Sequence, residues 1–270
     1  MTQDKNKIIN IISNNNYDSR KTSQILTKKL EDKGFIIPKK YDKNSVLNIC
    51  IGGDGAFLRT VHNFNFPKIP FVGINTGHLG FFQEILPENL DIFIDKYIKG
   101  EYLVEEISLL EAKVCTKSNC AKLIGINEIV IKGIASKVVH LEVYINDNHL
   151  EKFSGDGIIV ATPVGSTAYN FSSGGSIVYP TLKTMQITPL SPISSKAYRS
   201  LSNSTIVPGD MTIKIKPESL YENSILIIND GVQYTYKDIL EIYFTISNMT
   251  IFRLVFDENM YWNNLKSKFL

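Results

Sequence analysis

The first hundred residues alternate short apolar runs with segments of helical periodicity. Three runs rich in Ile and Val predict strands at residues 7–12, 46–51 and 69–75. Apolar residues at helical spacing predict helices at residues 22–33, 56–63 and 87–97, and Gly100 ends the last of them. Alternating strands and helices indicate an open parallel sheet, in which ligands bind beyond the carboxyl ends of the strands.

The pattern changes between Tyr102 and Phe256, where many short apolar segments are separated by turn signals. They predict strands at residues 107–114, 122–131, 138–145, 157–161, 204–207, 211–215, 225–228 and 239–246. The turn Asn146-Asp-Asn148 joins two of them as a hairpin. The tract Ser172–Ser204 is rich in Ser, Pro and Gly, and we expect it to be mostly irregular and functional.

These patterns predict a domain organisation in three parts. Residues 1–100 form an open α/β (Rossmann-like) domain, and residues 101–256 form a β-rich, sandwich-like domain. Residues 257–270 form a C-terminal helix, with Met260, Tyr261, Leu265 and Phe269 at helical spacing, that packs back on the first domain.

Composition narrows the class of protein. The chain has 270 residues, 43% of them hydrophobic and 21% charged, as is usual for a soluble globular protein. A net charge of +2, spread along the chain, gives no case for nucleic-acid binding, and no apolar run approaches the roughly 20 residues of a membrane span. Cys50, Cys115 and Cys120 cannot form a disulfide framework and lack metal-binding spacing, so we expect a reducing, cytoplasmic compartment.

The organising feature is Gly52-Gly53-Asp54-Gly55, between the second predicted strand and the helix after it. Glycines let backbone approach a ligand, and free N–H groups at a helix start attract phosphate. Asp54 places a negative charge where phosphates would bind, which requires either a metal ion or a role in proton transfer. The alternative is a plain turn in which Asp54 caps the helix.

Four other clusters are candidates. The turn Asn75–Phe82 follows the third strand, and its His78 is best explained as a polar surface group. Asn127-Glu128 could bind ribose hydroxyls or simply begin a strand. Residues 154–175 offer hydroxyls, free amides and one aromatic face, the groups that bind a base and its phosphates without adding charge. Asn229-Asp230-Gly231 is equally well explained as a hairpin turn or as a functional turn.

Several well-known motifs are missing from the sequence. It contains no P-loop, no protein-kinase motif set, no Gly-x-Ser-x-Gly nucleophile elbow and no His/Cys zinc spacing. It also lacks Gly-x-Gly-x-x-Gly, which argues against a nicotinamide dehydrogenase of the usual type.

The motifs that are present resemble those of the NAD kinases that use ATP or polyphosphate, from Val46 to Trp262. They are Gly-Gly-Asp-Gly at 52–55, Asn-x-Gly-x-Leu-Gly-Phe at 75–81, Asn-Glu at 127–128, Asp-Gly at 156–157, Thr-Pro-x-Gly-Ser-Thr-Ala-Tyr at 162–169 and Ser-Gly-Gly at 173–175. The chain departs from the family pattern at Ala56, where Thr is usual, and in the loop 193–201, where only Arg199 is retained.

The resemblance implies an active site between the two domains, in a homodimer or homotetramer. It implies a transferase that phosphorylates the 2′-hydroxyl of the adenosine ribose of NAD, using ATP with Mg²⁺ and giving NADP. Asp54 would take or orient the hydroxyl proton, and Mg²⁺ would arrive with the nucleotide, with no protein metal site. The binding residues would be Gly52, Gly53, Gly55, Arg59, Asn75, Gly77, Phe81, Asn127, Glu128, Asp156, Thr162, Thr167, Ala168, Tyr169, Ser172 and Ser173.

Two other functions remain open at this point. A lipid or diacylglycerol-type kinase shares Gly-Gly-Asp-Gly, but it lacks the Gly-Ser-Thr-Ala-Tyr element present at 165–169. A dinucleotide sensor with weak catalysis would account for Ala56 and the altered loop 193–201, yet the retention of Asp54, Asn127, Glu128 and Asp156 argues against it.

Overall fold

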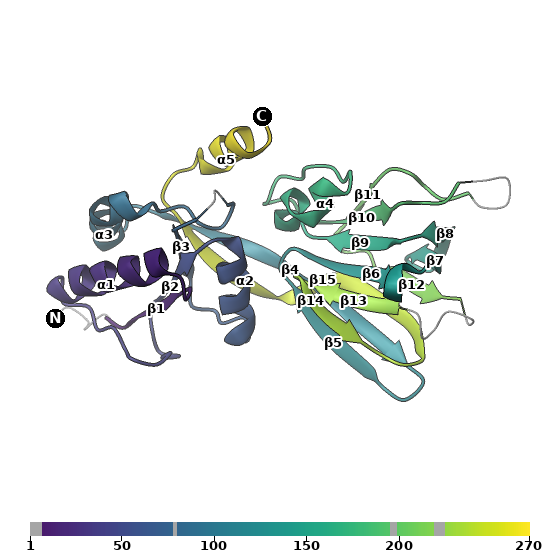
Figure 1. Cartoon of the computed structure of the whole chain (residues 1–270), viewed down its shortest axis with the longest axis horizontal. Helices are drawn as coiled ribbons and strands as arrows, with labels where there is room; N and C mark the ends of the chain where they lie inside the picture. The colour runs from purple at the N-terminus through teal and green to yellow at the C-terminus, as the bar shows by residue number, and fades with distance from the viewer. Residues whose placement is uncertain (1–6, 78–79, 195–198, 219–224) are drawn as a thin grey trace. The chain divides into compact units, whose positions relative to one another are not determined.

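The computed structural model describes residues 7–77, 80–194, 199–218 and 225–270, which form the two compact units drawn in Figure 1. Unit 1 contains residues 1–106 and 250–270, and unit 2 contains residues 107–249. The divisions fall inside the strands β4 (Leu103–Thr116) and β15 (Ile239–Val255), whereas the sequence pattern placed them near residues 100 and 256. Because β4 and β15 continue from one unit into the other, the sequence has no linker-like segment from which these boundaries could be predicted.

Unit 1 is built around a parallel sheet. Its order is β1 (Ile9–Ser13), β2 (Leu47–Gly52), β3 (Phe71–Asn75) and the C-terminal part of β15, which pairs with β3 at Arg253. Every residue of β2 and β3 is buried, which explains their continuous apolar pattern, because a parallel sheet is covered on both faces. The predicted open α/β fold of the N-terminal region is confirmed.

The helices of unit 1 are α1 (Tyr17–Asp32), α2 (Asp54–Asn63), the 3-10 helix η1 (Pro87–Asn89), α3 (Leu90–Lys99) and α5 (Met260–Phe269). In Figure 1, α1 and α3 lie side by side, and Lys29 of α1 pairs with Asp91 of α3 at 2.6 Å. α3 ends at Gly100 in the left-handed conformation, as predicted. α1 begins before the predicted residue 22, because the Asn16 side chain caps it by accepting a hydrogen bond from the Ser19 amide.

Unit 2 is a sandwich of two largely antiparallel sheets. The first has the order β11 (Thr205–Pro208), β10 (Thr184–Leu190), β9 (Gly157–Ala161), β6 (Glu128–Gly133), β13 (Ile225–Asn229) and β14 (Val232–Thr235). The second contains β8 (Asn148–Gly155), β7 (Val139–Ile145), β12 (Ile213–Pro217), the first part of β15, β4 and β5 (Cys120–Gly125). Ile131 and Ile158 of the first sheet share one buried cluster with Val143 and Phe244 of the second. The predicted sandwich-like fold is confirmed.

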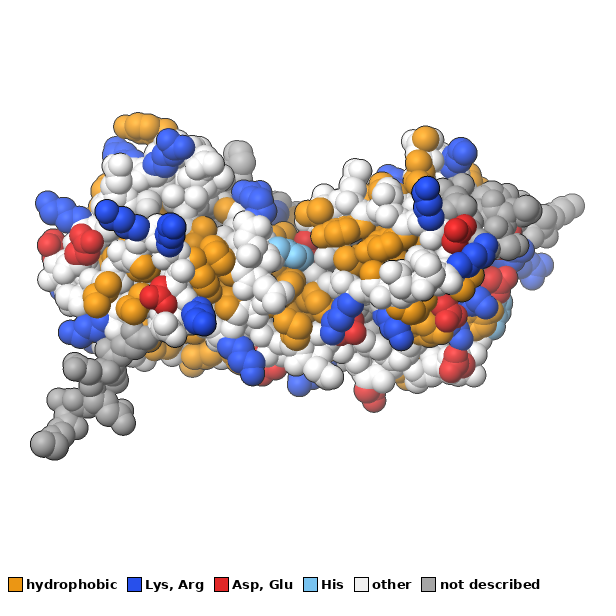
Figure 2. Space-filling view, turned by 90° about the horizontal axis from the view of Figure 1, so that it is seen from below, with side chains coloured by type: hydrophobic (Ala, Val, Ile, Leu, Met, Phe, Trp, Pro, Cys, Tyr) orange, Lys and Arg blue, Asp and Glu red, His pale blue; other side chains and the backbone are white. Residues whose placement is uncertain are grey.

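Short helical elements interrupt the strands of unit 2. They are η2 (Ile134–Ser136), η3 (Val164–Thr167) and α4 (Tyr169–Ser172). The predicted hairpin at residues 146–148 joins β7 to β8, and Asn146 and Asp147 have the positive φ values that such a turn needs. No helix in the described ranges is long and apolar enough to cross a membrane. On the face drawn in Figure 2, Lys and Arg side chains are scattered among apolar and acidic ones.

Two predictions for unit 2 were wrong. The run 122–131 is not one strand: β5 ends at Gly125, and β6 begins at Glu128 in the other sheet. The described part of the tract 172–204 is mostly irregular, as predicted, but it also contains β10, which the Ser-, Pro- and Gly-rich sequence around it obscures. Cys115 and Cys120 form a disulfide, because the register of β4 and β5 places them opposite each other with their Cα atoms 4.0 Å apart.

Candidate active site

Asp54 is the first residue of α2, at the carboxyl end of β2. The strand ends at Gly52, whose φ of +153° is rare for other residues, and a Cβ there would lie 2.7 Å from the Cβ of Ala56. Gly53 is the N-cap of α2 and supplies no side-chain cap. The alternative in which Asp54 caps its own helix is therefore wrong, and the carboxylate is bound elsewhere.

The carboxylate of Asp54 is bound by the turn that follows β3. Its Oδ2 accepts a hydrogen bond from the Phe81 amide and its Oδ1 accepts one from the Phe82 amide, both at 2.9 Å. A Cβ on Gly80 would stand 2.1 Å from Oδ1, so only glycine permits this approach. The structure thus brings the two predicted turns together, with the half-buried Asp54 carboxylate held against backbone.

Other side chains hold the two turns in place. The buried Gln83 donates from Nε2 to the Gly53 carbonyl at 3.0 Å, and Asn75 Oδ1 accepts from the Gly77 amide at 2.8 Å. Arg59 is exposed on α2, and its Nη1 lies 3.3 Å from the position that a Cβ on Gly55 would take. His78, predicted to be a surface group, lies outside the described residues, as do residues 195–198 of the altered loop.

In unit 2, Asp230 organises the start of β6. Asp230 and Gly231 form the turn between β13 and β14 with φ values of 46° and 85°. The Asp230 carboxylate accepts hydrogen bonds from the amides of Ile126, Asn127 and Glu128 at 2.7, 2.8 and 3.2 Å. The hairpin-turn explanation of this motif is confirmed, and the same turn also fixes the backbone of the predicted ribose-binding pair.

That pair is buried and incompletely hydrogen-bonded. Asn127 and Glu128 are 7% and 8% exposed, and Asn127 Oδ1 and Glu128 Oε2 have no hydrogen-bond partner among the described residues. Burial raises the pKa of Glu128 to about 8, and the neighbouring charge of Asp230 adds to the shift. Buried polar atoms without partners are rare, and together with a perturbed carboxyl they mark a candidate binding site.

The segment that follows β9 packs on the same turn. Thr162 donates from Oγ1 to the Ile126 carbonyl at 2.6 Å and from its amide to the Asn127 carbonyl at 2.9 Å. A Cβ on Gly165 would lie 2.0 Å from the Asn127 carbonyl oxygen, so this position requires glycine. The Thr162 hydroxyl is thus used in a hydrogen bond to the backbone. The contacts of Thr162 and Gly165 hold the start of η3 against the Asn127-Glu128 turn.

The remaining predicted residues lie on or near α4 and in the bend between β8 and β9. Thr167 is buried, whereas Tyr169 at the start of α4 is 41% exposed. Ala168 and Ser173 are half-buried, and Ser172 and Asp156 are exposed. The described residues contain no group of three or more His, Cys, Asp or Glu side chains placed to hold a metal ion.

A buried polar network that the sequence did not predict supports α4. Asn170 is fully buried, donates from Nδ2 to the Ser166 carbonyl at 3.1 Å and accepts from Thr188 Oγ1 at 2.6 Å. Gln186 Oε1 accepts from the Ser176 amide at 2.7 Å. No local signal pointed to this network, because its partners lie on β10, in the tract predicted to be irregular.

Comparisons with known proteins give a consistent result. The family model described as ATP-NAD kinase N-terminal domain matches residues 6–102, and the one described as ATP-NAD kinase C-terminal domain matches residues 126–248. The chain is 50% identical over 268 residues to an NAD kinase of Finegoldia magna, with 98% of each chain covered. It is 34% identical over 268 residues to an NAD kinase of Streptococcus gordonii, covering 98% of this chain and 96% of the relative.

Solved structures share the fold. A yeast NADH kinase complexed with NADH superposes with a TM-score of 0.86 at 22% identity, covering 98% of this chain and 88% of the other. An NAD kinase from Archaeoglobus fulgidus in complex with ATP superposes with a TM-score of 0.74 at 23% identity, covering 96% and 99%. At these identities the likeness supports the fold.

Proposed function

Because the chain belongs to the NAD kinase family and so phosphorylates NAD, we propose that Asp54 orients and deprotonates the ribose 2′-hydroxyl of NAD. The 2′-oxygen forms a bond to the γ-phosphorus of ATP while the bond from that phosphorus to the ADP oxygen breaks, and the hydroxyl proton passes to Asp54. The lipid kinase and the weakly catalytic sensor have no support, since both family models and a whole-chain relative match NAD kinases.

The observation that carries this proposal is the way the Asp54 carboxylate is held. Each oxygen accepts one backbone N–H bond and keeps a further lone pair for a substrate hydroxyl. Its direction is fixed before the substrate arrives, and this favours catalysis of phosphoryl transfer, where positioning dominates because the transition state is loose.

Asn127 and Glu128 are proposed to bind ribose hydroxyls. Asn127 Oδ1 and Glu128 Oε2 are buried oxygens that lack a partner among the described residues, and ribose hydroxyls are donors. A ligand hydroxyl would remove the free-energy penalty of leaving these oxygens unpaired. Asp230 and Thr162 support this pair through its backbone, so we propose a scaffold role for both.

The other predicted residues are proposed to bind the rest of the two nucleotides. Gly53 and Gly77 have open space where a Cβ would stand, so a triphosphate could approach their backbone, with Arg59 as a nearby cation. Gly52, Gly55, Asn75 and Phe81 shape these two turns. For NAD, we propose that Tyr169, Thr167, Ala168, Ser172 and Ser173 line the adenine and pyrophosphate region and that Asp156 accepts from the nicotinamide carboxamide.

The proposed substrates, metal ion and oligomeric state also follow from membership of the NAD kinase family. NAD and ATP are the proposed substrates, supported by the relatives solved with NADH and with ATP, and polyphosphate is a further candidate donor. Mg²⁺ is proposed to enter as the ATP complex and to neutralise phosphate charge. The exposed apolar residues Ile177, Tyr179, Leu182 and Ile206 of unit 2 support a homodimer or homotetramer. A cytoplasmic location stays a prediction.

The test is the variant Asp54→Asn, with Asp91→Asn as the control, since Asp91 also lies in the first turn of a helix but is exposed. NADP formation is measured with an NADP-specific dehydrogenase, and NAD binding is measured separately. We expect Asp54→Asn to lower kcat by about 10²–10⁴ and to leave NAD affinity and the control unchanged. Near-wild-type turnover in Asp54→Asn would refute the role of Asp54.

A further inference from the structure

We propose that two residues near the C-terminus, Asn264 and Arg253, position Asp54 for the reaction by holding the backbone of Gly80–Phe82. This inference rests on the proposed role of Asp54, and it concerns residues that belong to none of the predicted site motifs. All the groups involved lie in unit 1.

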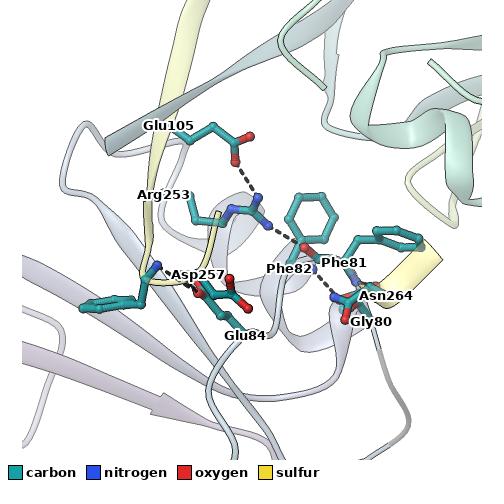
Figure 3. A network of polar contacts seen from close by, with 10 residues as sticks. Gly80, Phe81, Phe82, Glu84, Glu105, Arg253, Asp257 and Asn264 are labelled. Atoms are coloured by element: carbon teal, nitrogen blue, oxygen red, sulfur yellow. Dashed lines mark hydrogen bonds and ion pairs between the residues drawn. The ribbon is translucent and has the colours of Figure 1, made fainter. Parts of the chain in front are cut away.

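The segment Gly80–Phe82 contains two peptide groups, and each is hydrogen-bonded at both ends. Figure 3 shows the contacts from Arg253 and Asn264 to their carbonyls. In the first, Asn264 Nδ2 donates to the Gly80 carbonyl at 2.8 Å, while the Phe81 amide donates to Asp54. In the second, Arg253 Nη1 donates to the Phe81 carbonyl, while the Phe82 amide donates to Asp54. Among the described residues, both hydrogen bonds to the Asp54 carboxylate thus come from peptide groups whose carbonyls are held by residues near the C-terminus.

Because of the geometry of a peptide group, these contacts also fix the direction of the N–H groups that bind Asp54. A trans peptide group is planar, so its carbonyl and its N–H point in opposite directions, and fixing one fixes the other. The charge of Arg253 also polarises the peptide group between Phe81 and Phe82, and this strengthens the hydrogen bond that the Phe82 amide donates to Asp54. Loss of either donor lets the peptide rotate and turns its N–H away from the carboxylate.

Both donors are themselves fixed. Arg253 is 9% exposed, and its Nη2 pairs with Glu105 at 2.5 Å, so its guanidinium bridges that carboxylate and the Phe81 carbonyl. Asn264 is 6% exposed, whereas its neighbour Asn263 is exposed. A buried Asn on a short C-terminal helix is explained by its bond to Gly80.

Aromatic side chains also pack the segment Gly80–Phe82 against α5 and α2. The Phe81 ring lies 5.9 Å from the ring of Tyr261 and 6.0 Å from that of Phe269, both on α5. The Phe82 ring stacks on Phe57 of α2 with centroids 4.6 Å apart, one helical turn beyond Asp54.

The segment that leads into α5 is anchored as well. Glu84 Oε1 accepts from the amides of Phe256 and Asp257 at 2.8 and 2.5 Å. Lys96 Nζ donates to the Phe256 carbonyl at 3.2 Å. These contacts set where α5 begins and so where Asn264 stands.

The experiment compares Asn264→Ala with the matched control Asn263→Ala, which removes the same side chain one position away on the exposed side of α5. We expect Asn264→Ala to lower kcat about tenfold to a hundredfold, the range for a small misplacement of a reacting group. KM for NAD and for ATP should stay close to wild type, and Asn263→Ala should leave all three constants unchanged. Arg253→Lys serves as a second variant, since Lys keeps the charge but cannot bridge Glu105 and Phe81 in the same way.

A double-variant cycle separates positioning from a general loss of structure. If Asn264 acts through Asp54, adding Asn264→Ala to Asp54→Asn should lower kcat much less than it does in the wild-type background. Wild-type kcat in Asn264→Ala and Arg253→Lys, or an equal fold-change in both backgrounds, would overturn the inference. Wild-type kcat in Asp54→Asn would instead overturn the proposed role of Asp54. Thermal midpoints identify any variant that fails to fold, and the inference is then decided on the other variant.

Discussion

Asp54 in unit 1 and Glu128 in unit 2 carry carboxyl groups with opposite surroundings. Asp54 is half-buried, and both of its oxygens accept backbone N–H bonds. Glu128 is buried, its Oε2 has no partner among the described residues, and its pKa is raised to about 8. The Glu128 amide donates to Asp230, and the nearby charge of Asp230 raises the pKa of Glu128 further.

The difference shows how one side-chain type serves two purposes. A carboxylate whose direction is fixed by backbone suits a step in which a proton must leave at a defined place. A buried carboxyl without a full set of partners suits binding, because a ligand donor supplies what the protein lacks. We therefore expect changes around Asp54 to act on kcat and changes around Glu128 to act on NAD binding.

The largest effect is expected from Gly80→Ala. A Cβ at this position would lie 2.1 Å from Asp54 Oδ1, so the carboxylate must leave its place. We expect kcat to fall by about a hundredfold or more, with NAD affinity retained, as measured by steady-state kinetics and by titration with NAD. Wild-type kcat in a folded Gly80→Ala enzyme would contradict the claim that the position of the Asp54 carboxylate controls catalysis.

A smaller effect, on binding and stability, is expected from Asp230→Asn. The amide side chain of Asn cannot accept all three backbone N–H bonds, so the Asn127-Glu128 turn loosens. We expect a higher KM for NAD and a free energy of unfolding lower by about 1–3 kcal/mol. The control is Asp147→Asn, which lies in a hairpin turn with a similar positive φ but is exposed. Equal loss of stability in both variants would contradict the special role of Asp230.

The smallest effect on turnover is expected from the titration of Glu128, which makes stability depend on pH. Burial and the charge of Asp230 raise the pKa of Glu128 in the folded state to about 8, against about 4.3 in an unfolded chain. The folded protein therefore binds this proton more tightly, so the contribution of Glu128 to stability is fully present below the unfolded pKa and is lost as pH rises through about 8.

Glu128→Gln removes this titration, so the variant should gain stability relative to wild type as pH increases. Urea unfolding at an acidic pH and at a pH above the folded pKa measures the change, with the exposed Glu101→Gln as the control. A stability difference between Glu128→Gln and wild type that did not vary with pH would contradict the buried, perturbed state of Glu128.

Local features of the sequence predicted much of the fold and part of the candidate site. The apolar run that ends in Gly52-Gly53-Asp54-Gly55 specifies strand, turn and helix within a few residues, so its structure could be predicted. The bond from Phe81 to Asp54 could not, because it depends on the pairing of β2 with β3 that brings two turns together. For this reason Gly80 and Phe82, although inside the candidate turn Asn75–Phe82, were given no role, and Gln83 was not predicted.

In both units, hydrogen bonds between residues far apart in the chain could not be predicted from the sequence pattern. Asp230 and Asn127 are separated by 103 positions, and Asn264 and Gly80 by 184. Helical spacing on α5 identified Met260, Tyr261, Leu265 and Phe269 as apolar positions, and a polar Asn264 among them carried no signal. Only the folded chain shows that this Asn is buried and which carbonyl it binds.

The most direct test measures kcat and the dissociation constant for NAD in Asp54→Asn and Glu128→Ala side by side. The account predicts that Asp54→Asn lowers kcat by about 10²–10⁴ with unchanged NAD affinity, and that Glu128→Ala, which removes the buried acceptor oxygens, weakens NAD binding with a smaller change in kcat. Wild-type turnover in Asp54→Asn, or the reverse division of effects between the two variants, would contradict it.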